Sequence, residues 1–193
     1  MSDDKYCPGY IFHDGEDYPE IAAWCNANGC YIKELTPDSE GRRFEIVKIP
    51  PKSLDETKAD KIAELNAAKN RQLDTGGLEY MEDLFAYDDK ALLRISGTIL
   101  DWQDQISRGT VQPEDIVQPW ISKANRVHAL SYDHLIELAR LLRQEVQRIV
   151  FYGTYLEKLA QAATTLEELD AIVWDYGAAS ASGIIDRLIA GGN

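Results

Sequence analysis

The chain has 193 residues, and its 33 Asp and Glu against 20 Lys and Arg give a formal net charge of −13 at pH 7. This excess of carboxylates argues against sequence-independent binding of nucleic acid or of an anionic membrane surface, because both need cations that face phosphate groups. Hydrophobic residues make up 45% of the chain and charged residues 27%, a balance typical of globular proteins. No apolar stretch is long enough to span a bilayer, and without a secretory signal we expect reduced thiols in a cytoplasm.

Residues 1–50 predict a small β-α-β-β module. A short β-prone run at residues 10–12 ends at a His-Asp-Gly turn, and a helix with proline in its first turn follows at residues 17–28. Residues 30–35 and 44–49 are strand candidates, and the turn-rich segment between them favours a hairpin. We expect Trp24, on the helix, to lie against the sheet.

Residues 51–73 are predicted to be a linker followed by a connector helix. A Pro-Pro pair at 50–51 makes a stiff spacer, and residues 56–69 are rich in the strong helix formers Glu, Lys and Ala. The apolar positions of this helix form only a narrow stripe: Ile62, Leu65 and Ala68. Because such a helix is marginal alone, we expect it to pack on another chain or to protrude as a connector.

Residues 74–176 predict a mainly helical domain, so that the whole chain belongs to the α+β class. Its expected elements are, in chain order, a hairpin at 78–87, a helix at 89–107, a hairpin at 120–130, a long helix at about 132–163 and a short helix opened by the capping box Thr165–Glu168. Apolar residues recur through the long helix at a period near 3.5, which predicts a partner helix within the chain or in another chain.

Residues 177–193 are predicted to be a small-residue linker and a C-terminal docking helix. Four large aliphatic residues lie within six positions of this helix and form the candidate partner-binding site: Ile184, Ile185, Leu188 and Ile189. Their i, i+4 spacing suits an apolar groove on a second copy or on a neighbouring protein. The alternative is a helix folded back onto its own core.

No catalytic residue, cofactor site or metal site is predicted, and we do not expect an enzyme. The candidate zinc ligands are Cys7, His13, Cys25 and Cys30. They lack the close Cys pair that structural zinc sites use, so the better interpretation is that the three cysteines are free and buried. The carboxylates around the hairpin at 78–87 lack the order of a calcium loop, and we expect them to form a solvated acidic edge: Glu79, Glu82, Asp83, Asp88 and Asp89.

From about Lys58 to Ile172 the chain resembles an uncharacterised domain of tail-fibre and tail-fibre-assembly proteins of tailed bacteriophages. The resemblance rests on residues 61–71, Gly76-Gly77, Phe85, Asp88, Arg94-Ile95, Trp120, Asn125-Arg126, Leu130-Ser131 and residues 163–169. These positions mark the ends of helices and hairpins and carry no catalytic signature. The chain departs from the family at residues 121–124, Ile-Ser-Lys-Ala, where the family often has a Thr and an Asp before the Asn.

The resemblance implies a non-enzymatic structural or adaptor component of a phage tail, in the fibre or baseplate region. Such a protein is made in the host cytoplasm and resides in the virion tail, where it contacts other tail proteins and forms a homo-oligomer or occurs in several copies. Neither nucleic acid nor a membrane is expected as a partner. The alternative that remains open is a tail-fibre assembly chaperone that is absent from the mature virion.

Overall fold

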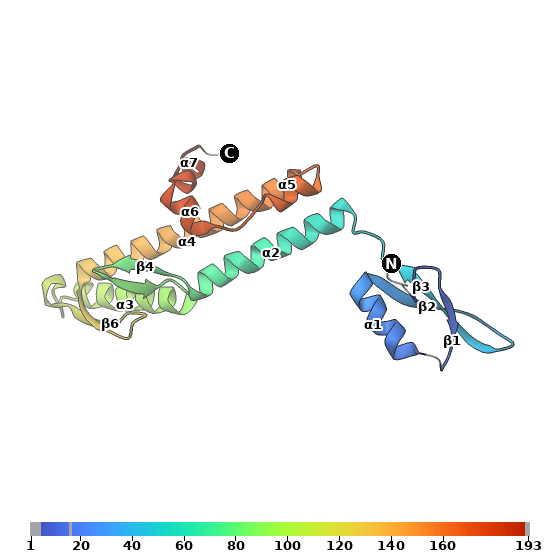
Figure 1. Cartoon of the computed structure of the whole chain (residues 1–193). Coiled ribbons are helices and arrows are strands. Elements are labelled where there is room, and N and C mark those ends of the chain that lie inside the picture. Colours follow the sequence, from blue (N-terminus) through green and yellow to red (C-terminus); the bar gives the residue numbers. More distant parts are fainter. Residues whose placement is uncertain (1–4, 16, 192–193) are drawn as a thin grey trace. The chain divides into compact units, whose positions relative to one another are not determined.

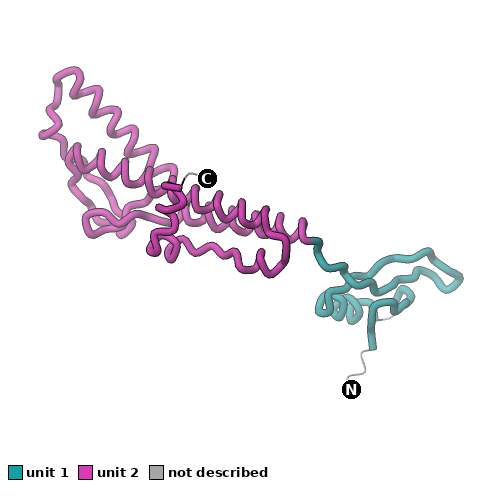
Figure 2. Tube along the Cα trace, turned by 90° about the horizontal axis from the view of Figure 1, so that it is seen from above, with its two compact units in different colours: residues 1–53 teal, residues 54–193 magenta. Residues whose placement is uncertain are grey.

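The computed structural model describes residues 5–15 and 17–191. The chain divides into two compact units, Met1–Ser53 and Leu54–Asn193, drawn in teal and magenta in Figure 2. The boundary falls just after the Pro-Pro pair at 50–51. Helices together with small antiparallel sheets confirm the α+β class.

The first unit has the β-α-β-β order expected from the sequence. Its elements are β1 (Ile11–His13), α1 (Tyr18–Asn28), β2 (Cys30–Asp38) and β3 (Gly41–Lys48), and the antiparallel sheet has the order β1-β3-β2. Helix α1 ends at Gly29, whose φ of 63° is the left-handed conformation that glycine adopts at low cost. Helix and sheet enclose a small core: Tyr6, Phe12, Ile21, Cys25, Cys30, Phe44 and Ile46, with Trp24 packed against it.

The second unit is organised around one long helix. Its elements are α2 (Leu54–Thr75), β4 (Gly77–Tyr80), β5 (Asp83–Ala86), α3 (Asp89–Ser107), a short 3-10 turn (Pro113–Asp115), β6 (Val117–Ile121), β7 (Val127–Ser131), α4 (Tyr132–Ala162), α5 (Leu166–Asp170), α6 (Tyr176–Ala181) and α7 (Ile184–Gly191). Helices α2, α3 and α7 all pack against α4, and α2 runs along it (Figure 1). Most residues of α4 that the 3.5 period places on its inner side are buried, among them Leu135, Leu138, Leu142, Ile149 and Leu156, whereas Val146 in the same row is only partly buried.

Side-chain caps begin three helices of this unit where the sequence placed them. Asp88 accepts a hydrogen bond from the backbone N–H of Ala91 at 2.9 Å, and Ser131 accepts one from His134 at 3.3 Å. Thr165 accepts one from Glu168 at 3.2 Å, while the Glu168 carboxylate accepts one from the N–H of Thr164 at 2.6 Å. Each cap satisfies a helix N–H that has no partner within the helix.

Helix α2 is a core element of the second unit, unlike the protruding connector expected from its narrow stripe. Leu65 is fully buried, and Ile62 and Leu73 pack against the same core. Lys58 donates to the carbonyl of Gln161 at 3.0 Å, which ties the start of α2 to the end of α4. The narrow stripe suffices because α4 supplies a broad apolar face, so that α2 needs to contribute only one row of side chains.

The C-terminal segment also differs from its prediction. Residues expected to form a small-residue linker form helix α6, which Asp175 caps by accepting a hydrogen bond from Ala178 at 3.0 Å. Tyr176 and Ala179 are buried in the core, and so is Ile185 of α7. Alanine is the strongest helix former, and with a cap in place the segment folds back onto its own unit.

Candidate interaction surfaces

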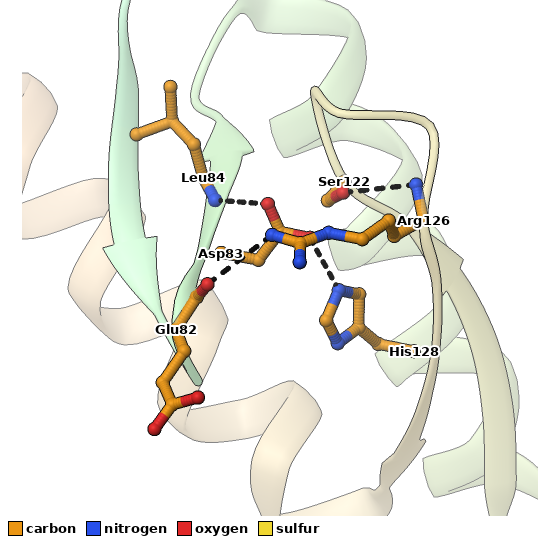
Figure 3. A network of polar contacts seen from close by, with 6 residues as sticks. All are labelled: Glu82, Asp83, Leu84, Ser122, Arg126 and His128. Carbon is orange, nitrogen blue, oxygen red and sulfur yellow. Dashed lines mark hydrogen bonds and ion pairs between the residues drawn. The ribbon is translucent and has the colours of Figure 1, made fainter.

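The two hairpins of the second unit are joined by an ionic network centred on the buried carboxylate of Asp83 (Figure 3). Asp83 is only 5% exposed, and its Oδ2 accepts a hydrogen bond from Nε of Arg126 at 2.8 Å and lies 2.7 Å from Nε2 of His128. Its Oδ1 accepts one from the backbone N–H of Leu84 at 2.8 Å. The side chain of Ser122 accepts a hydrogen bond from the N–H of Arg126 at 3.3 Å. We call these residues the Asp83 clasp.

The electrostatics of the clasp favour a fixed charge. Hydrogen bonds from Arg126 and Ser122 hold the pKa of the Asp83 carboxyl well below its ordinary value, because they favour the ionised form. Backbone bonds reinforce the join, since Lys123 N–H donates to the carbonyl of Leu84 at 2.8 Å. The buried side chain of Ser122 also hydrogen-bonds to the carboxylate of Asp83. This contact links β5 to the β6–β7 hairpin.

The clasp corrects one sequence-based expectation. The acidic edge expected from the sequence includes Asp83, and the pattern of the hairpin at 78–87 also favours a turn at Glu82-Asp83. The turn residues are instead Met81 and Glu82, which adopt φ values of 49° and 61°, so that Asp83 begins β5 and points inward like Phe85 two residues later. The alternation of Asp83, Leu84 and Phe85 along one strand is the signal that could have placed this carboxylate on the inner face.

The β6–β7 hairpin exposes an apolar face. Its register pairs Ile121 with Val127 and Pro119 with Ala129, so their side chains lie on one face together with that of Val117. All five residues are exposed, and Val127 has 68% of its surface accessible. The opposite face carries Trp120, His128 and Leu130 toward the interior. We call Val117, Pro119, Ile121, Val127 and Ala129 the hairpin face.

Helix α3 exposes a second apolar stripe beside this hairpin. The guanidinium of Arg94 lies 5.8 Å from the centre of the Trp120 ring, which places α3 next to β6. Leu93 and Leu100 are 76% and 65% exposed, and Gly97 lies between them. With Val127, these leucines are the three most exposed large apolar side chains of the described residues.

A groove separates α3 from α4 on the other side of the stripe. Its volume is about 560 Å³, and its apolar wall consists of Ile99, Leu100, Ile136 and Ala139. Two cations stand on its α4 rim: Arg143 donates to Oγ of Ser96 at 2.9 Å and Arg140 donates to Oε1 of Gln144 at 3.0 Å. Within residues 5–15 and 17–191, neither arginine forms an ion pair with a carboxylate.

The structure separates the four aliphatic residues of the predicted docking helix. Ile185 is fully buried against the core, whereas Ile184 and Ile189 are partly exposed. Leu188 lines a small pocket with Phe151 and Tyr155 of α4. Ion pairing between Arg148 and Asp186 and a hydrogen bond from Arg148 to Ser180 at 3.1 Å also hold this region on α4. Ile185 is therefore not available to a partner while α7 is docked.

The remaining chemical candidates belong to the first unit. Cys25 and Cys30 are buried in the first unit and Cys7 is exposed, all three as free thiols. His13 lies 3.4 Å from a carboxylate oxygen of Asp38. The described part of the chain contains no group of three or more His, Cys, Asp or Glu arranged to hold a metal ion.

No helix among the described residues combines the length and the apolarity needed to cross a membrane.

The family model of a domain of unknown function, DUF4376, matches residues 56–176. The match spans more than half of the chain, and the chain therefore belongs to the DUF4376 family. The Asp83 clasp, the hairpin face and the α3–α4 groove lie inside the matched range, whereas the first unit and α7 lie outside it. No curated protein and no solved structure matches the chain.

Proposed function

We propose that this member of the DUF4376 family is a non-enzymatic structural or adaptor component of a bacteriophage tail, in the fibre or baseplate region. It acts through protein–protein contacts with other tail proteins, after synthesis in the host cytoplasm. The observation that carries the proposal is the exposed apolar surface formed by the hairpin face and by Leu93 and Leu100 of α3.

This surface supports binding because the unit that bears it already has a complete core. Fully burying an aliphatic side chain is worth about 1.5 to 3 kcal/mol, so several leucines and valines left in water represent free energy that a partner can recover. An exposed apolar face of this kind on a folded domain marks an interaction site. The assignment to a phage tail rests on the resemblance of residues 58–172 to domains of tail-fibre and tail-fibre-assembly proteins.

The test is the protein content of phage particles that encode this chain. Particles purified on a density gradient are analysed by quantitative mass spectrometry, with a major tail protein as the internal reference. We expect the chain at a fixed copy number per particle. Its presence in the lysate together with its absence from the particles would overturn the proposal in favour of a tail-fibre assembly chaperone.

A matched pair of variants connects the function to the surface. Val127→Asp places a charge on the hairpin face, whereas Val173→Asp changes the same residue type at a similar exposure, 62%, in the loop between α5 and α6. Both positions are solvent-accessible, so we expect both purified variants to keep the wild-type melting temperature. Particles should lose the Val127→Asp chain and retain the Val173→Asp chain; equal incorporation of the two would contradict the role of this face.

A further inference from the structure

We propose that α3 is a homodimer interface, in which two copies of the chain pair α3 against α3 in antiparallel orientation about Gly97. Each α3 then lies along the α3–α4 groove of the other copy. The inference builds on the proposed function, because it names a second copy of this chain as the occupant of one part of the exposed apolar surface. The hairpin face remains available to other proteins.

The outer face of α3 has the spacing of a helix–helix seam. Five exposed residues follow one another at intervals of three and four: Lys90, Leu93, Gly97, Leu100 and Asp104. These intervals are those of the a and d positions of a heptad, so the five side chains form one stripe. The opposite side of α3 carries Ala91 and Ile95 into the core of the unit. The outer stripe is therefore apolar at its centre and charged at its two ends, and its own unit leaves it uncovered.

No neighbouring atom of its own unit crowds the position of Gly97. Glycine in a helix interior is less favourable than alanine. A Cβ added at Gly97 would meet no atom within 4 Å, so nothing in the unit requires the missing side chain. A second backbone that approaches closely at this point does require it. The two leucines on either side of Gly97 then surround the point where the helices cross.

Charge determines the direction of the pairing. The first half of α3 carries Lys90 and Arg94 together with Asp89, and the second half carries Asp101 and Asp104. Asp104 also forms an ion pair of 2.9 Å with Arg108 of its own chain. An antiparallel pair places the cations of one copy beside the carboxylates of the other, twice by symmetry. A parallel pair, or a parallel trimer, would place like charges together and is therefore disfavoured. The sequence of α3 is therefore complementary to itself only in the antiparallel orientation.

The groove enlarges the contact and completes the charge pattern. Leu100 belongs both to the stripe and to the groove wall, so a helix laid on the stripe also covers the groove. The carboxylates of that helix come near Arg143, which donates a hydrogen bond to the Ser96 hydroxyl in its own chain. A helix of 19 residues is about 28 Å long, and a stable interface needs about 800 Å² per partner, so stripe and groove are both needed.

The test is the oligomeric state of the full chain and of α3 variants. Sedimentation equilibrium from about 1 to about 200 µM should show a monomer–dimer equilibrium with a micromolar Kd. Gly97→Gln replaces glycine by a better helix former at a position open to solvent, so we expect a higher Tm together with a Kd at least about tenfold weaker. A variant that merely damaged the fold would lower Tm, which separates the two explanations.

A charge exchange tests the orientation. Lys90→Glu and Asp104→Lys should each weaken the dimer at least about tenfold, and the double variant should restore it, because it exchanges the two charges across the interface. Lys158→Glu makes the same charge change on the exposed side of α4 and should leave Kd unchanged. The inference is overturned by a monomer at about 200 µM, by a trimer, by a dimer insensitive to Gly97→Gln, or by a double variant that is not restored. A monomeric chain that is still found in phage particles would overturn the dimer and leave the tail component standing.

Discussion

Replacing Ile185 by alanine is the most direct test of how the C-terminal helix α7 is held. Ile185 is fully buried in the core of the second unit, whereas its neighbour Ile184 is 39% exposed. The two residues have the same side chain and adjacent places in one helix. Any difference between Ile185→Ala and Ile184→Ala therefore reports the burial of the side chain, since helix propensity changes equally in both.

The expected magnitudes follow from that burial. Ile185→Ala removes three carbons at about 0.8 kcal/mol each, and the cavity that remains raises the loss in unfolding free energy to about 3 kcal/mol. For a unit of this size the loss lowers Tm by about 6 to 10 °C. Ile184→Ala leaves no closed cavity, and we expect a loss of about 1 kcal/mol or less.

Thermal unfolding followed by circular dichroism gives the comparison, and amide hydrogen exchange of residues 176–191 identifies local undocking. Deletion of residues 177–193 should destabilise the monomer at least as much as Ile185→Ala, because it also removes the buried Ala179. Equal effects of the two alanine variants, or a deletion that leaves Tm unchanged, would mean that α7 is not part of the core and binds elsewhere.

Three further predictions concern other parts of the chain. Gly76→Ala should lower the free energy of unfolding by about 1 to 3 kcal/mol, since a Cβ would lie 1.9 Å from the Tyr87 hydroxyl and 2.5 Å from a backbone oxygen; chemical denaturation measures it. The fold lowers the pKa of the Asp83 carboxyl, so its contribution to stability is complete above about pH 4 and is lost as the pH falls further. The Tm of the wild type should therefore drop more steeply below about pH 4 than the Tm of Asp83→Asn. Parallel curves of Tm against pH for the two proteins would contradict this prediction. Limited trypsin digestion should cut first at Lys52, between the two units, and spare Lys58, which lies inside α2; cleavage within a unit first would refute the separation.

The elements that the sequence predicts well are those with a local physical signature. Caps, glycines and a sustained apolar period were sufficient for the β-α-β-β module and for α4, because each depends on neighbours within a few residues. The partners of a surface are a different matter. The stripe of α2 and the apolar positions of α7 were both recognised, yet sequence spacing shows that a face is apolar without showing what covers it.

The clasp illustrates the same limit for a polar residue. Asp83 finds Arg126 and His128 across 43 and 45 positions of chain, so no local pattern joins them. An acidic residue in a turn-rich segment is most often solvated, and the prediction of an acidic edge followed that tendency. The carboxylate meets Arg126, His128 and Ser122 only because the fold places the two hairpins side by side.

That placement connects the clasp to the exposed apolar surface. A two-stranded hairpin is marginal on its own, and an apolar face open to water gives β6 and β7 little reason to hold their register. Asp83 fixes both ends of the turn between them, through Ser122 before it and Arg126 and His128 after it. The carboxylate of Asp83 is buried while the Arg126 side chain is 62% exposed, and contacts from both sides of the turn favour one geometry of the hairpin. We therefore expect Asp83→Asn to weaken binding through the hairpin face more than its effect on Tm alone would explain, because the variant keeps the side-chain volume and loses the charge that holds Arg126. Wild-type affinity in a folded Asp83→Asn chain, measured with a tail protein that the wild type binds, would show that the face is ordered without the clasp.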